Sequence, residues 1–202
     1  VWCSQDEGWI ETNPFECINM RYIKSKPTPK QVKVLDEVDK KVNELPDYQQ
    51  CLYWIMRYTG THVGEAAGLR YEDIDLQAGV IYIKTNDLRP LKTAYRTREL
   101  PIIKPLMEKL TALLRKQAKG HIFPGLYEEK YARWGNGMSW HRTLGISPKE
   151  CRDSVARQLR DAEINERVLG AILGHTPKTS TGVYGSVSME AKRNALNKLI
   201  NR

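Results

Sequence analysis

Apolar residues recur at helical spacing in several separate stretches of the chain. In the first stretch, Thr28 and Pro29 have the form of a helix start and are followed by regularly spaced valines and leucines. This pattern predicts a helix over residues 29–45. A second helix is expected over residues 47–60, and a short one over residues 65–69.

The spacing changes between residues 79 and 102, where β-branched and aromatic residues gather. Residues 79–86 and 93–102 are two such segments separated by a short turn, and together they predict a β-hairpin. Residues 71–75 are expected to supply a third strand. Because the surrounding segments are helical, the sequence predicts one small antiparallel sheet within a helical fold.

Helical spacing returns after the hairpin, with leucines between residues 106 and 114. Residues 147–150 then read Ser-Pro-Lys-Glu, a capping box with proline at the first helical position. Asn165 and Gly174 have the form of a helix start and a helix stop, and a last helix is predicted over residues 188–200. The expected fold class is α+β, a mostly helical domain with a small three-stranded antiparallel sheet.

Composition narrows the class of protein. The chain has 202 residues, 41% hydrophobic and 28% charged, which suits one globular domain. No apolar run approaches the ~20 residues needed to cross a bilayer, and we expect a cytoplasmic protein. The four cysteines lack the spacing of a zinc site and are expected to be reduced, mostly packed thiols. No metal or other cofactor is expected. A formal charge of +8 favours a polyanionic partner, because clustered lysines and arginines release phosphate counterions.

Four short polar segments lie where the predicted elements begin or end. Taken alone, their side chains have structural explanations: Tyr184 as a half-buried core residue, His175 as a helix cap and Arg152 as part of a solvated helix face. The order of the segments is more specific. They are TGTHVGEAAGL (59–69), LKTAYRTRELPI (91–102), SPKECRDSVARQL (147–159) and ILGHTPKTSTGVYGSV (172–187).

In this order the four segments resemble the catalytic domain of the tyrosine recombinases, the phage integrase family. The resemblance covers residues 24–187, and its most specific part is a Leu-Gly-His sequence followed by Tyr184 nine residues after the histidine. It implies the tyrosine-recombinase catalytic fold over residues 24–202, with residues 1–23 as the linker from an N-terminal DNA-binding domain. It also implies double-stranded DNA attachment sites as substrate, no membrane, a monomer when free and a homotetramer on DNA.

The resemblance implies a role for each matching residue. Tyr184 is the nucleophile that forms a 3′-phosphotyrosine ester, a step that requires no metal. Arg152 holds two phosphate oxygens with its planar guanidinium, and His175 hydrogen-bonds a phosphate oxygen or the nucleophile. Lys149 stands where the family has a histidine or lysine and supplies a further donor. Lys92 is expected to protonate the leaving 5′-oxygen; a solvated hairpin lysine is the alternative.

His62 departs from the family pattern, which has its first catalytic arginine at this position. Because an imidazole is largely neutral at pH 7 and reaches less far, reduced activity is expected. Three explanations are open: one changed residue in an intact enzyme, a substitute that works when protonated beside DNA, or a chain that only binds DNA. Glu65 matches an acidic residue that supports the site from behind; an exposed helix carboxylate is the alternative.

The leading hypothesis is site-specific DNA recombination through a phosphotyrosine intermediate, with phage or prophage integrase as the expected role. A catalytically inactive DNA-binding relative is the first alternative, motivated by His62. A basic helical interaction module whose motif match is accidental is the second.

Overall fold

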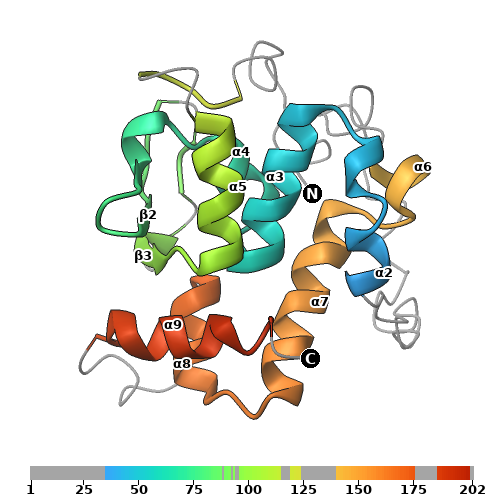
Figure 1. The fold of residues 1–202 in the computed structure, drawn as a ribbon. Helices are drawn as coiled ribbons and strands as arrows, with labels where there is room; N and C mark the ends of the chain where they lie inside the picture. The colour runs from blue at the N-terminus through green and yellow to red at the C-terminus, as the bar shows by residue number, and fades with distance from the viewer. Residues whose placement is uncertain are drawn as a thin grey trace, which may run out of the picture. The chain divides into compact units, whose positions relative to one another are not determined.

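The computed structural model describes residues 35–87, 89–91, 93, 96–114, 119–123, 140–175 and 186–200. In these ranges, one small sheet lies at one side of a set of helices (Figure 1). The α-helices and the 3₁₀ helices, labelled η, are α2 (Leu35–Asp39), η2 (Val42–Glu44), α3 (Asp47–Thr59), α4 (Val63–Ala67), η3 (Tyr71–Asp73), α5 (Lys104–Leu114), α6 (Trp140–Leu144), α7 (Pro148–Asp161), α8 (Glu166–Leu173) and α9 (Met189–Asn197). The strands are β1 (Ile74–Asp75), β2 (Val80–Ile83) and β3 (Arg98–Pro101).

Helix α3 runs through the described core. Residues 51–57 are all buried, and the helix contacts α4, α5 and α7 (Figure 1). It ends at Gly60, whose φ of 64° is a left-handed conformation that favours glycine. A Cβ atom at this glycine would lie 2.9 Å from Leu173 and 3.2 Å from Val155. The end of α3 therefore fits so closely against α7 and α8 that there is no room for a side chain at this position.

The three strands form an antiparallel sheet in the order β1-β2-β3. Ile74 lies opposite Ile81 in the first pair, and Ile83 lies opposite Arg98 in the second. Because side chains alternate between the faces of a strand, Arg98 lies on the same face as the buried Leu100. The predicted fold class, including its third strand, is confirmed.

Helix α9 packs on β3 and α8 of its own chain. The buried Lys192 ammonium donates to the backbone oxygen of Glu99 at 2.9 Å, and Arg193 donates to that of Ile102 at 3.1 Å. These bonds satisfy backbone oxygens at and just beyond an edge strand that α9 covers. The predicted last helix is thus present, although it ends at Asn197 rather than at residue 200.

The first predicted helix ends earlier than expected. Helix α2 stops at Asp39, whose carboxylate accepts hydrogen bonds from the Tyr53 hydroxyl at 2.6 Å and from Arg57 at 3.2 Å. These bonds hold the end of α2 against α3. The short helix η2 follows and still buries Val42, so the apolar spacing is satisfied without one continuous helix. The predicted start before residue 35 lies outside the described residues.

The second hairpin strand is also shorter than predicted. It begins at Arg98 rather than at residue 93, because the Arg96 amide donates to the Thr93 oxygen at 3.1 Å and turns the chain there. The predicted domain boundary at residue 23 lies outside the described residues and stays a prediction. None of the helices in the described ranges has the length and apolar character required to cross a membrane.

Candidate active site

The start of α7 sets the direction of Arg152. Ser147 accepts a hydrogen bond from the Glu150 amide at 3.2 Å, and the Glu150 carboxylate accepts one from the Ser147 amide at 2.8 Å. With Pro148 at the first position, this is the predicted capping box. Lys149 and Arg152, three residues apart, therefore lie on one side of the helix.

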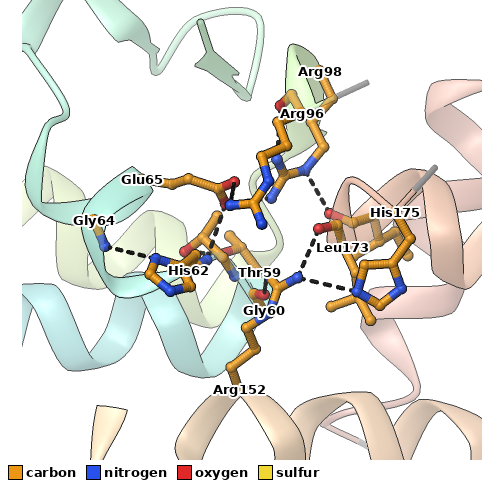
Figure 2. A network of polar contacts seen from close by, with 12 residues as sticks. Thr59, Gly60, His62, Gly64, Glu65, Arg96, Arg98, Arg152, Leu173 and His175 are labelled. Atoms are coloured by element: carbon orange, nitrogen blue, oxygen red, sulfur yellow. Dashed lines mark hydrogen bonds and ion pairs between the residues drawn. The ribbon is translucent and has the colours of Figure 1, made fainter. Parts of the chain in front are cut away.

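Arg152 reaches from α7 to the ends of two other helices. Its Nη1 donates to the backbone oxygen of Gly60 at 2.6 Å and its Nη2 donates to that of Leu173 at 2.8 Å (Figure 2). These oxygens belong to the C-terminal ends of α3 and α8, where the helix dipole favours a cation. Burial lowers the pKa of the Arg152 guanidinium to about 10, which leaves it charged at neutral pH.

His175 lies directly beyond α8, beside Arg152. Its Nε2 is 3.3 Å from Nη2 of Arg152, and since a guanidinium can only donate, Nε2 accepts and the ring proton lies on Nδ1. Partial burial and the charge of Arg152 both lower the pKa of His175, so the ring is neutral at pH 7. The preceding Gly174, with φ of 70°, is required here: a Cβ would lie 2.7 Å from Arg98.

His62 caps the start of α4. Its Nδ1 accepts a hydrogen bond from the Gly64 amide at 3.2 Å, while Glu65 accepts one from the His62 amide at 3.0 Å. An Nδ1 that accepts carries no proton, so the capping ring is neutral. Desolvation lowers the pKa of His62 further; Glu65 opposes this shift and Arg152 adds to it.

Glu65 is buried behind these side chains and is not an exposed helix carboxylate. One of its oxygens accepts from Arg98 at 2.8 Å, and the other lies 3.4 Å from Arg96. Burial by itself would raise the pKa of Glu65, but the hydrogen bond and charge of Arg98 outweigh it and lower the pKa. Three guanidinium groups, including that of Arg152, thus lie around one carboxylate, and the cluster keeps a net positive charge.

The structure brings four of the seven predicted site residues into this one cluster, from α4, α7 and the segment after α8: His62, Glu65, Arg152 and His175 (Figure 2). Lys149 is exposed on α7, with no polar partner among the described residues. Lys92 and Tyr184 lie outside the described residues. Within the described ranges, no group of histidine, cysteine and acidic side chains could hold a metal ion.

Arg96 and Arg98 were not among the residues predicted to form the site. Arg98 donates to the Ile172 oxygen at 2.7 Å, to the Arg96 oxygen at 2.8 Å and to Glu65. A signal for it was present, because strand alternation places Arg98 on the apolar face, where a buried arginine needs an acidic partner. No comparable pattern distinguishes Arg96.

The fold and the basic cluster define a mostly helical domain with a polar site suited to an anion such as a phosphate. The phage integrase family profile matches residues 27–191, and the chain belongs to this family. It is 26% identical to tyrosine recombinase XerC of Oceanobacillus iheyensis, over 94% of this chain and 67% of that protein. Tyrosine recombinase XerA of Pyrococcus furiosus is 24% identical, over 84% of this chain and 59% of that protein.

Solved structures share the fold at lower identity. The integrase from mycobacterium phage Brujita has a TM-score of 0.62 at 18% identity, covering 98% of this chain and 67% of that one. The Tn1549 transposon integrase, in complex with transposon right end DNA, has a TM-score of 0.56 at 15% identity, covering 95% and 73%. The chain spans 67% of the length of the first of these curated relatives and 59% of the second.

Proposed function

We propose that the protein is a site-specific DNA strand transferase that cuts and rejoins duplex attachment sites through a phosphotyrosine intermediate at Tyr184. The observation that carries this proposal is the convergence of Arg152, His175 and His62 from three separate segments on one net positive cluster. Family membership supports the reaction class. The expected role in phage or prophage integration stays a prediction.

In the proposed reaction, Arg152 and His175 hold the scissile phosphate. Three N–H groups of Arg152 are used by the Gly60 oxygen, the Leu173 oxygen and Nε2 of His175, which fix the guanidinium in place and leave its other two N–H groups for phosphate oxygens. The neutral His175 ring has Nδ1–H as a donor, because its Nε2 accepts from Arg152. Donors held in place before the reaction stabilise the charge that develops on the phosphate.

The bond changes are an exchange of one ester for another. The Tyr184 oxygen bonds to phosphorus, the bond from phosphorus to the 5′-oxygen breaks, and Lys92 gives that oxygen a proton. The phenolic proton leaves to solvent, because the acceptor nitrogens of His62 and His175 are both engaged. Rejoining reverses these changes with a 5′-hydroxyl from another strand. Lys149, exposed beside Arg152, supplies a further donor to the phosphate.

A DNA-binding protein without cleavage activity is the second candidate. The observation that favours it is the capping bond of His62, which uses the ring in its neutral form where the family has an arginine. A neutral ring in place of a fixed donor costs on the order of 10²-fold to 10³-fold in rate. We therefore propose a slow enzyme rather than an inactive DNA-binding protein. We also propose that it acts as four protomers on two duplexes.

A covalent trap separates the two candidates. The protein is incubated with a pool of nicked duplexes randomised around the nick, and DNA that stays attached in detergent is recovered and sequenced. The proposal predicts an enriched sequence that is lost in Tyr184→Phe. Retention of DNA only under native conditions would favour the DNA-binding protein without cleavage activity. No retention in detergent or under native conditions would contradict both candidate functions.

A further inference from the structure

Arg96 and Arg98 lie two residues apart but have different surroundings. The side chain of Arg98 is 4% exposed and makes three short hydrogen bonds, one from each of its guanidinium nitrogens. The side chain of Arg96 is 30% exposed, and its one polar contact among the described residues is the 3.4 Å approach to Glu65. Arg96 therefore has N–H groups to spare for a ligand.

The position of Arg96 is on the rim of the cluster. It follows the turn that begins at Thr93, and its Cα lies 3.3 Å from the position that a Gly174 Cβ would occupy, next to His175. In Figure 2 its side chain extends toward Glu65, on the side of the cluster opposite Arg152. Desolvation is the main cause of the lowered pKa values of His62 and His175, and the charge of Arg96 adds to both.

We propose that Arg96 is a further phosphate-binding residue, whose guanidinium supplies the fixed positive charge that His62 lacks. This inference rests on the proposed function, since it concerns the same scissile phosphate. A bound phosphate would face Arg152 on one side and Arg96 on the other, with the two imidazoles between them. The weak contact to Glu65 would give way to a charge-assisted bond to the phosphate.

Inorganic phosphate is the probe, because its binding depends neither on a DNA sequence nor on Tyr184. Its affinity for the full 202-residue chain is measured by calorimetry or by ³¹P NMR. Arg96→Gln is expected to weaken binding about tenfold, the effect of one hydrogen bond between charged groups. Arg96→Lys should retain part of the affinity. Arg157→Gln is the matched control, since its side chain is 60% exposed and pairs only loosely, at 3.7 Å, with Asp161.

The combination with His62→Arg separates phosphate binding from a structural role. If Arg96 supplies the missing charge, Arg96→Gln should matter much less once position 62 carries an arginine, so the two effects are not additive. A purely structural role would give the same loss in both backgrounds. Thermal unfolding of each variant confirms that it is folded.

Unchanged phosphate affinity in Arg96→Gln, or no measurable binding by the parent chain, would overturn this inference. Equal losses with and without His62→Arg would also overturn it. Failure of the proposed function is a separate outcome, because it is recognised by the absence of a Tyr184 adduct and not by phosphate affinity. Arg152→Gln provides the reference for a phosphate ligand that both proposals require.

Discussion

Helices α4 and α7 both begin with a capping box, but the two boxes are built from different residues. At α7 the cap is the hydroxyl of Ser147, and the charged Arg152 follows five residues later. At α4 the cap is the imidazole of His62 itself, and Glu65 completes the box. At α7 one residue supplies the cap and another supplies the positive charge. At α4 both the cap and the positive charge would have to come from His62.

This difference explains why His62 is a poor source of charge. A serine cap works the same way at any pH near neutrality, whereas a histidine cap works only while Nδ1 is unprotonated. Protonating the ring to serve a phosphate would therefore break the bond to the Gly64 amide. Position 62 therefore supplies a cap for α4 where the family has a fixed charge.

The largest expected effect is that of His62→Arg on DNA cleavage. Arginine adds a fixed cationic donor at position 62, which Arg96 replaces only in part, and adduct formation should rise by up to about 10²-fold to 10³-fold. An arginine side chain cannot accept a hydrogen bond from the Gly64 amide, so the free energy of unfolding of the variant should be about 1 kcal/mol lower. Adduct yield on the nicked duplex pool and urea unfolding measure the two changes. Equal cleavage by both forms would contradict the proposal that the histidine at position 62 slows the reaction.

The second largest effect is a difference in stability between substitutions of the glutamates in the two capping boxes. Glu65→Ala leaves the buried Arg98 without its acidic partner, and a loss of about 3–5 kcal/mol in the free energy of unfolding is expected. Glu150→Ala removes the corresponding partner at α7 and should cost only about 1 kcal/mol. Urea unfolding of the two variants checks the order. Similar costs would mean that Glu65 acts mainly as a cap.

A smaller effect is expected from the serine cap. Ser147→Ala removes the acceptor of the Glu150 amide and should cost about 1 kcal/mol, whereas Ser147→Asp restores an acceptor and should cost much less. Because the cap holds the first turn that carries Lys149, adduct formation is expected to fall in proportion to the loss of helix. A stable but inactive Ser147→Ala would place Ser147 in the chemistry instead.

The smallest effect concerns pH. The folded-state pKa of His62 lies below its ordinary value of 6.5, so the unfolded chain binds protons first as the pH falls. The stability that depends on the neutral ring is thus complete above about pH 6.5 and is lost below it, by less than about 1 kcal/mol for this exposed group. His62→Asn keeps a cap that does not titrate, and its unfolding free energy should fall less between about pH 7.5 and about pH 5.

His175 titrates in both proteins, so the difference between the two curves, rather than either curve alone, reports on His62. Parallel curves would show that the capping bond does not depend on protonation.

The elements that follow local rules were predictable from the sequence. Ser147 and Asn165 start helices through side-chain acceptors, and Gly60 and Gly174 end helices in left-handed conformations. These rules act over a few residues and need no knowledge of the rest of the fold. The first helix was predicted too long, because the inward turn of the Asp39 carboxylate depends on partners in α3.

Four of the predicted site residues lie together in the structure, but their contacts were not predictable from the sequence. That Arg152 is held by the backbone oxygens of Gly60 and Leu173 follows from how three helix ends meet, which no local pattern contains. Histidine is not among the preferred capping residues, so the role of His62 at α4 could not be read from the sequence. Strand alternation marked Arg98 as an inward residue, whereas the position of Arg96 beside Glu65 depends on tertiary contacts alone.

We propose that Tyr184 joins DNA at a cluster built around Arg152 and His175. Mass spectrometry of trypsin-digested adducts from the parent chain and from His62→Arg tests this attachment directly. We predict that a nucleotide is attached to the peptide 179–192, at Tyr184, in both forms, with a higher yield when arginine is restored. Attachment at another tyrosine, or no attachment in either form, would contradict the account.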